Sequence, residues 1–549
     1  MTNTISSNST HEFDHPIRSV AVIGSGPTGT PAARHLQEAG LKVRLFERQS
    51  QSGGIWNWRP AASLPLSVPT PPPSRGAFTP VLRESGVYED PDRSEREHFS
   101  PPNPCYWNLT NNVPTTTMAF KDFPYPDGTD LNVSHTVFSK YVHDYAKHFG
   151  LDKVASYNTR VEKADKVASQ WRLNLRKVVD EGEDRAREEQ WTEEFDAIVV
   201  ATGHYNAPYI PALSGSDTWA NAWPDKVIHS QGYRLPEPYK DKTVLLIGIG
   251  TSGNDIARDI DPFVKRTYMV GRNKLRGPPA YQKQRKMQRF MLPQKAEAVS
   301  EIHRFLPPKL GQPIREAEVE LSDGRILKGI DEVIFATGYQ YSFPFLPNYH
   351  QDYEQVASNS LAKHHLVSDG SGVLNLWRDV FYIPDPSLTF IGLSVNTSAF
   401  SFFEYQSISI ARVLSGKARL PDEATRWADY AQLVKEKGEG KFSHLLNRDG
   451  ERSYVRDTVE WLNKDAEWSG AEPVQGHSAE WIAESDKMVQ LLASKYGVTL
   501  EQLKQIDVEI AAGDGRTSDG TAKSFETAAE ETNARAIEGI ARRVATVKA

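Results

Sequence analysis

Two glycine-rich turns in this sequence have the residue types and spacing that bind the phosphates of a dinucleotide. One follows the apolar run Val20–Ile23 and spans residues 24–29; the other follows Thr243–Ile247 and spans residues 248–253. In such a strand–turn–helix unit the first glycine permits a tight turn, the second lets the backbone approach a diphosphate, and the third allows close helix–strand packing. The phosphates then contact free N–H groups at the helix N-terminus. The candidate binding residues are Gly24, Gly26, Pro27 and Gly29 in the first turn and Gly248, Gly250, Thr251, Ser252 and Gly253 in the second.

The residue that ends the following strand differs between the two units. Glu47 lies 23 residues after Gly24, where a carboxylate takes the ribose hydroxyls. Arg272 lies 24 residues after Gly248, where a cation takes a 2′-phosphate. We therefore expect two dinucleotides, FAD at the first turn and NADPH at the second. A flavin would carry the redox chemistry, and the protein would supply orientation and electrostatics.

Composition narrows the function classes. The 549 residues include 64 Lys and Arg against 71 Asp and Glu, a net charge of -7, which argues against a nucleic-acid partner. Cys105 is the only cysteine, so no CxxC pair, disulfide or thiolate metal cluster is expected. A disulfide reductase, which shares the two-dinucleotide plan, is excluded on the same ground. No apolar run approaches membrane-spanning length and the polar N-terminus lacks a secretory signal, so we expect a cytoplasmic protein without membrane attachment.

The elements that must position the two turns form an α/β protein with two Rossmann-like domains, the second inserted in the first. Buried strands ending in Ala-Thr-Gly, at 195–203 and 331–338, bracket the insertion. The expected boundaries are 1–208 and 335–450 for the FAD domain, 209–334 for the NADPH domain, and 451–549 for a helical C-terminal extension. Residues 1–17 are expected to be disordered and 537–544 to lie on an amphipathic helix. The proline-rich stretch 60–105 is open to interpretation as a lid, a dimer arm or a cover over the substrate channel.

The motifs, in this order over residues 18–420, resemble those of the flavin-containing monooxygenases, the class B flavoprotein monooxygenases. Residues 53–57 (GGIWN) are similar to the family's GGxW segment, 106–123 to its TNxP…M…DFP segment, and 388–406 to its C-terminal flavin-side segment. The resemblance places Gly54, Trp56 and Gln406 beside the FAD. It places the family's active-site Asn, two positions before Pro, at Asn112, although the neighbouring Asn111 leaves the choice between the two open.

The family's diagnostic segment FxGxxxHxxx(Y/F) corresponds to residues 223–233. His229 and Tyr233 match it, whereas Trp223 and Asp225 depart from it. We expect His229 to shape the linker to the NADPH domain rather than to act as a base.

The resemblance implies an NADPH- and O2-dependent monooxygenase of the N,N-dimethylaniline type. It would oxygenate a soft heteroatom of a small molecule, an amine nitrogen or a sulfide or thiol sulfur, through a C4a-hydroperoxyflavin that bound NADP+ and Asn112 protect. Dimers are common in the family, so a homodimer is one expected state. Two alternatives stay open: a Baeyer–Villiger monooxygenase acting on ketones, which Tyr233 disfavours because those enzymes usually carry Trp there, and an NADPH oxidase or sensor without an organic product.

Overall fold

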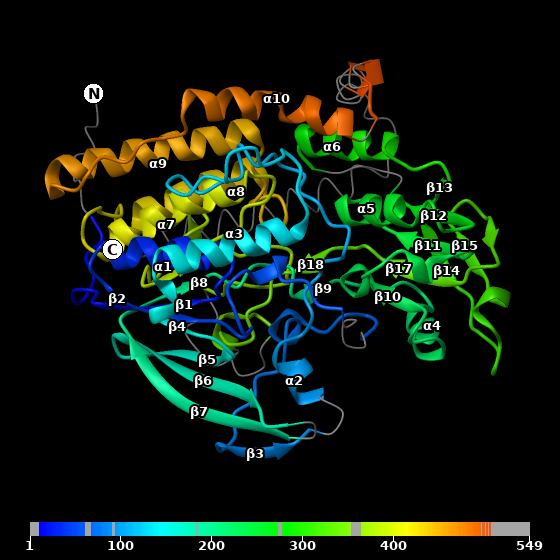
Figure 1. The fold of residues 1–549 in the computed structure, drawn as a ribbon, viewed down its shortest axis with the longest axis horizontal. Helices are drawn as coiled ribbons and strands as arrows, with labels where there is room; N and C mark the ends of the chain where they lie inside the picture. The colour runs from blue at the N-terminus through cyan, green and yellow to red at the C-terminus, as the bar shows by residue number, and fades with distance from the viewer. Residues whose placement is uncertain are drawn as a thin grey trace.

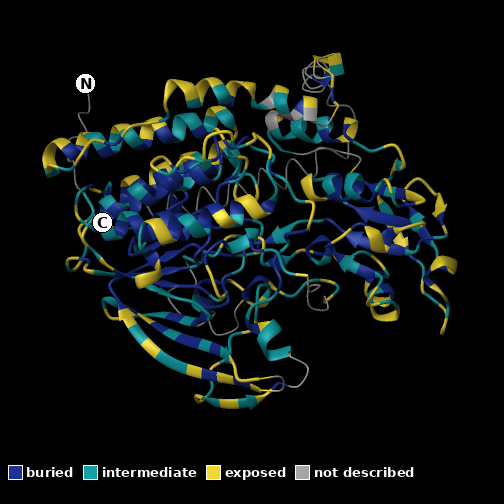
Figure 2. Ribbon diagram, viewed as in Figure 1, coloured by how far each residue is buried: buried dark blue, intermediate teal, exposed yellow. Residues whose placement is uncertain are grey.

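A seven-stranded sheet gathered from three stretches of the chain forms the centre of this computed structural model (Figure 1). Its strand order is β19-β20-β21-β8-β1-β2-β4. β1, β8 and β21 are parallel neighbours, and their mostly apolar residues are almost entirely buried, as expected for a sheet covered on both faces (Figure 2). The strands are β1 Ser19–Ile23, β2 Lys42–Phe46, β4 Ala155–Ser156, β8 Ala197–Val200, β19 Leu376–Trp377, β20 Phe381–Tyr382 and β21 Leu388–Phe390.

A second, five-stranded parallel sheet is built from the stretch of chain between these pieces. Its order is β10-β17-β11-β12-β13, and a small antiparallel sheet, β14-β15-β16, lies next to it. Where the chain passes between the two large sheets, β9 (Ala207–Pro208) on the way out pairs antiparallel with β18 (Tyr339–Gln340) on the return. The remaining bounds are β10 Val227–His229, β11 Thr243–Ile247, β12 Arg266–Val270, β13 Ala296–Val299, β14 Ile302–Phe305, β15 Val319–Leu321, β16 Ile326–Leu327 and β17 Glu332–Phe335.

Helices cover both sheets and build the C-terminal region. In Figure 1, α1, α3 and α7 lie against the first sheet, α5 and α6 lie over the second, and α9 and α10 form an outer layer that reaches α6. Side-chain caps start several of them: Ser134 accepts the N–H of Thr136 at α3, and Asp422 accepts that of Thr425 at α8. The bounds are α1 Gly29–Glu38, α2 Ser94–Phe99, α3 His135–His148, α4 Ser216–Ala222, α5 Thr251–Ile260, α6 Pro279–Phe290, α7 Phe400–Leu414, α8 Glu423–Lys437, α9 Arg448–Ser469 and α10 Ala479–Lys495.

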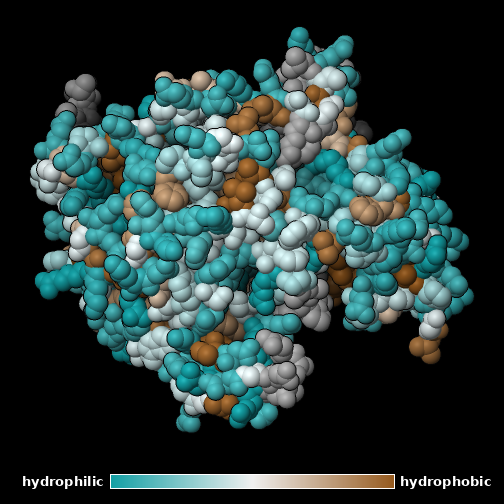
Figure 3. Space-filling view, in the orientation of Figure 1, coloured by the Kyte–Doolittle hydropathy of each residue, from teal (hydrophilic) through white to brown (hydrophobic). Residues whose placement is uncertain are grey.

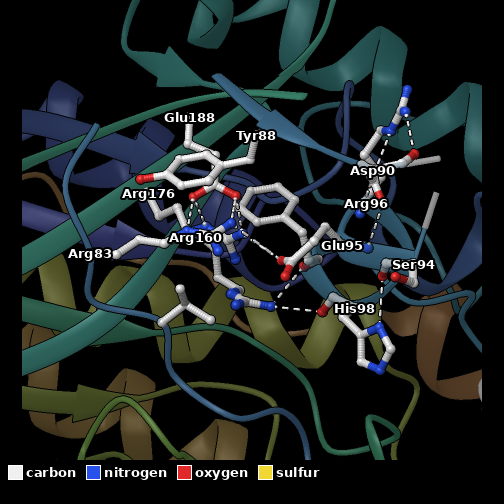
Figure 4. A network of polar contacts seen from close by, with 12 residues as sticks. Arg83, Tyr88, Asp90, Ser94, Glu95, Arg96, His98, Arg160, Arg176 and Glu188 are labelled. Carbon is white, nitrogen blue, oxygen red and sulfur yellow. Dashed lines mark hydrogen bonds and ion pairs between the residues drawn. The ribbon is translucent and has the colours of Figure 1, made fainter. Parts of the chain in front are cut away.

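The proline-rich stretch supplies one strand of a four-stranded antiparallel sheet, β3, and buried ion pairs hold it there as well (Figure 4). Arg83 of this stretch and Arg176 of the sheet both bind Glu188, each through an Nε–Oε2 contact of 2.9 Å. Arg160 donates to the backbone carbonyls of residues 98 and 99 at 2.8 and 3.0 Å. A buried charge left unpaired costs several kcal/mol, so these pairs hold the stretch in place. The sheet contains β3 Gly86–Glu89, β5 Thr159–Val167, β6 Gln170–Asp180 and β7 Arg185–Phe195.

Near the N-terminus, the expectation of disorder is wrong for the part that the structure describes. Thr10 forms a bridge with Pro421, and the N–H of His11 donates to the carbonyl of Leu420 at 3.0 Å. The backbone of this segment is paired with the chain that leads into α8, which the sequence pattern alone did not indicate. The described residues are 10–60, 67–90, 94–182, 185–272, 277–352, 364–495, 497–499, 501–502 and 504–506; the expected helix at 537–544 lies outside them.

The face of the molecule that Figure 3 shows is mostly hydrophilic. Figure 3 shows apolar side chains on this face only in small groups, one of them beneath α10. Within the described residues, no helix is long and apolar enough to cross a membrane.

Candidate active site

Both glycine turns lie where parallel strands end at a common sheet edge. Ile23 is opposite Phe46 and Val200 in the first sheet, so the first turn, the end of β2 and the Ala-Thr-Gly segment after β8 converge. Ile247 is opposite Val270 and Phe335 in the second sheet, which repeats the arrangement. Ligands of open α/β sheets bind outside this edge. The structure therefore brings together, within each sheet, the turn and strand-end residues that the sequence motif separated.

The first and third glycines of each turn are required by geometry. Gly24 has a φ of 106°, and a Cβ on Gly29 would lie 1.7 Å from the Gly24 carbonyl oxygen. In the second turn Gly248 has a φ of 116°, and a Cβ on Gly253 would lie 2.0 Å from the Gly248 oxygen. No larger residue fits without moving the helix against its strand.

The helices that follow these turns present uncapped N-termini. Neither α1 nor α5 has a side-chain hydrogen bond at its N-cap position. The first backbone N–H groups of a helix have no partner within the helix, so an anion is the natural ligand. Both turns thus fit the phosphates of a bound dinucleotide.

The Glu47 carboxylate is hydrogen-bonded to the backbone of the first turn. Its Oε2 accepts the Ser25 N–H at 2.7 Å, and its Oε1 accepts the Gln49 N–H at 2.8 Å. Burial raises the pKa of this carboxyl even though both hydrogen bonds oppose the change. Glu47 therefore stands at the strand end where the motif places a ribose ligand, held by two backbone donors.

The GGIWN segment lies directly against the first turn. A Cβ on Gly54 would lie 2.9 Å from the Gly26 α-carbon, so the two backbones are in contact. Trp56 stacks on Phe138 of α3 with ring centroids 4.5 Å apart. Asn57 fixes this segment, because its Oδ1 accepts from Ser139 at 2.7 Å and its Nδ2 donates to Gln49 at 2.7 Å.

A cavity of about 380 Å³ opens beside Trp56. Three indole rings contribute to its wall, those of Trp56, Trp58 and Trp107, and the last two meet edge-to-face at 5.0 Å. The other described residues that line it are neutral amides and hydroxyls, two histidines and one lysine, with no carboxylate among them: Gln51, Asn57, His135, Thr136, Ser139, Lys140 and His143.

Asn111 and Asn112 have different environments. Asn111 is 3% exposed, and its Nδ2 donates to the carbonyls of Val113 and Leu131 at 2.7 and 2.8 Å. Its Oδ1 accepts the N–H of Val133 at 2.7 Å. Asn112 is only half-buried. Asn111 is therefore committed to holding the loop, and Asn112 stays a prediction for contact with a ligand.

His229 and Tyr233 are both fully buried. His229 Nε2 contacts the Gly338 carbonyl at 3.0 Å, and its Nδ1 accepts the Gln231 N–H at 3.1 Å. Burial lowers the pKa of this imidazole to about 3. The Tyr233 hydroxyl donates to Asp259 of α5. The His229 contact therefore fixes the segment that leads to β18, and the Tyr233 contact fixes α5. The linker role of His229 stays a prediction.

Gln406 lies inside α7 and is fully buried. Its Oε1 accepts the N–H of Gly392 at 3.1 Å. A Cβ on Gly392 would lie 2.4 Å from Thr28 Cγ2, so this segment packs on the first turn. Gln406 thus holds Gly392 in place, and Gly392 packs against the first turn.

At the second turn, Thr251 and Ser252 are exposed at the start of α5, and Arg272 is exposed after β12. The structure adds two residues from α6 that no motif indicated. Gln288 Nε2 donates to Thr251 Oγ1 at 3.3 Å, and Arg285 Nη1 donates to the Ile249 carbonyl at 3.4 Å. The motif ends before α6, so only the fold brings this helix over the turn.

Comparison with known proteins agrees with this geometry. The model of the family described as flavin-binding monooxygenase-like matches residues 101–275 and 308–474, and that of an NAD(P)-binding Rossmann-like domain matches residues 22–63. The flavin-containing monooxygenase iboF of Amanita muscaria is 34% identical, over 85% of this chain and 91% of its own length. The flavin-containing monooxygenase FMO GS-OX-like 2 of Arabidopsis thaliana is 30% identical, over 82% and 85%.

The solved structure of S-allyl-L-cysteine S-oxygenase from Allium sativum shares the fold, with a TM-score of 0.61 and 24% identity over 90% of this chain and 98% of that one. The match of the family model and of full-length relatives, together with two uncapped phosphate turns on two parallel sheets, leads to one conclusion: this chain belongs to the flavin-binding monooxygenase-like family, is a flavin-dependent monooxygenase, and uses FAD and NADPH.

Proposed function

We propose that this enzyme transfers one oxygen atom of O2 to the nitrogen of an amine or to the sulfur of a thioether or thiol. NADPH supplies the two electrons, the second oxygen atom leaves as water, and the heteroatom lone pair forms the new bond to oxygen. Bound FAD supplies the chemistry that activates O2. One solved structure of the same fold supports this proposal in general terms, because it is that of an S-allyl-L-cysteine S-oxygenase.

The cavity beside Trp56 carries the proposal. Its indole walls favour a weakly hydrated, apolar substrate, because apolar surface gains by leaving water. Its lack of a lining carboxylate suits a neutral amine or sulfide, whose lone pair needs no general base to become nucleophilic.

The roles of the individual residues follow from their places. We assign the FAD to residues 1–208 and 335–450 and the NADPH to residues 209–334. Asn112, whose neighbour Asn111 pins the loop, would donate a hydrogen bond at the reacting oxygen. The tryptophans would exclude water from that atom, so that reducing equivalents reach the substrate rather than forming peroxide.

The test is product analysis under 18O2. Purified enzyme and NADPH are supplied separately with an alkyl aryl thioether, a tertiary aryl amine and a cyclic ketone of similar size. We expect a labelled sulfoxide or N-oxide, with NADPH consumption that matches product. A labelled lactone would favour the ketone alternative, and NADPH consumption with peroxide as sole product would favour the oxidase.

A further inference from the structure

Arg285 stands against the second glycine turn. A Cβ on Gly250 would lie 3.0 Å from Arg285 Nη1, so the guanidinium contacts the backbone at the middle glycine. Its described hydrogen bonds are to neutral oxygens, Gln288 Oε1 at 2.9 Å and the Ile249 carbonyl at 3.4 Å. The middle glycine is the one that lets a diphosphate approach the backbone. A cation therefore lies beside the backbone that the diphosphate would approach.

A second cation, Lys441, lies over the same aromatic ring as Arg285 and comes from the other domain. Tyr281, one turn before Arg285 on α6, lies beneath the Arg285 guanidinium at 4.8 Å and the Lys441 ammonium at 5.2 Å. Phe442, next to Lys441, meets the Tyr281 ring at 5.3 Å and secures this approach. Lys441 belongs to the chain beyond the returning strand β18, whereas α6 covers the sheet of the second turn.

The cluster of Arg285, Lys441 and Tyr281 is electrostatically positive. Burial alone would raise the pKa of Tyr281, yet Arg285 and Lys441 lower it below its ordinary value. Among the ion pairs of the described residues, none involves Arg285 or Lys441. The uncapped N-terminus of α5 adds its own partial positive charge. Two cations, a helix terminus and no acidic partner in the described part of the chain form a receptor for an anion.

We propose that Arg285 and Lys441 bind the diphosphate of NADPH, so that the nucleotide is held by both domains at once. Arg272, which follows β12, would bind the 2′-phosphate, and Arg285 and Lys441 would bind the diphosphate. This inference rests on the proposed function, in which NADPH is the electron donor. It adds the residues that bind the diphosphate, which NADP+ and NAD+ have in common. Charge-assisted contacts of this kind are the strong ones in phosphate recognition.

The test measures binding without turnover, by titration calorimetry of the flavin-loaded enzyme with NADP+, NAD+ and 2′,5′-ADP, which has no diphosphate. We expect Arg285→Gln to weaken NADP+ and NAD+ binding by a similar factor of about ten, and Lys441→Gln by about three, with 2′,5′-ADP affected much less. Arg272→Ala should weaken NADP+ and 2′,5′-ADP but not NAD+.

Arg266→Gln is the matched control. Arg266 starts β12, opposite Thr243 at the far end of the same sheet, and its side chain is 54% exposed. It removes the same charge from the same domain, so we expect all three affinities to stay within about twofold. The proposal fails if Arg285→Gln leaves NADP+ and NAD+ binding unchanged, or if it weakens NADP+ alone. Because no product is measured, this outcome is independent of the substrate assay.

Discussion

Glu451 offers a stability prediction whose size can be worked out from its surroundings. This residue of α9 is 2% exposed, and its Oε2 accepts the N–H and the hydroxyl of Ser398 at 2.9 and 3.2 Å. Its other oxygen has no hydrogen-bond partner among the described residues. Burial raises the pKa of this carboxyl from 4.5 to about 7, against the opposing effect of the hydrogen bonds from Ser398.

The sign follows from proton linkage. Between pH 4.5 and 7 the unfolded chain has lost this proton and the folded chain still holds it, so Glu451 makes stability fall as pH rises. Above pH 7 the full penalty is about 3 kcal/mol, at 1.36 kcal/mol per pKa unit. At about 2.1 cal/mol/K per residue, unfolding of the whole chain carries an entropy of roughly 1.2 kcal/mol/K, so this penalty corresponds to about 3 °C in Tm.

Glu451→Gln removes the penalty, because the amide oxygen can still accept from Ser398 and carries no charge. We expect the Tm of this variant, relative to that of wild type, to rise by about 2 °C between pH 5 and pH 9, because most of the penalty develops between pH 5 and the folded pKa of about 7. Unfolding is followed by circular dichroism and by the release of flavin fluorescence. Glu460→Gln changes the same charge on the exposed side of the same helix and should show no such trend. A Tm difference for Glu451→Gln that is constant with pH, or that falls as pH rises, would refute the reasoning.

Three further predictions concern the active site. Asn112→Ala should lower the amount of product formed per NADPH consumed, while the flavin content is retained. Asn111→Ala should instead lower Tm, because it removes three hydrogen bonds from the Asn111 side chain to backbone groups. The same product yield per NADPH in Asn112→Ala and wild type would contradict the assignment. Arg272→Ala should raise the NADPH KM and narrow the preference for NADPH over NADH, and an unchanged preference would remove Arg272 from the 2′-phosphate site. Gly29→Ala should yield protein largely free of flavin by absorbance, since its Cβ would lie 1.7 Å from the Gly24 oxygen, and full flavin occupancy would show that the turn can relax.

The sequence by itself determined the parts of this enzyme that depend on local spacing. A strand, three glycines and a helix form a phosphate turn wherever they occur in this order, because the third glycine packs on the backbone carbonyl of the first within the same turn. Both turns, the two cofactors and the α/β class could therefore be predicted. The match of this chain to the flavin-binding monooxygenase-like family model and to its relatives confirms the predicted family.

Only the tertiary structure decided which groups from distant parts of the chain meet. Asn111 and Asn112 are identical in type, and only the fold gives Asn111 its hydrogen-bond partners, two carbonyls and an N–H up to 22 residues away. The contacts of the proline-rich stretch with Arg160 and Arg176 of the neighbouring sheet also depend on the fold, because these arginines lie more than 60 residues further along the chain. Arg285 joins the second turn only because α6 folds back over it. Burial and charge pairing are properties of the packed chain, and no spacing along the sequence encodes them.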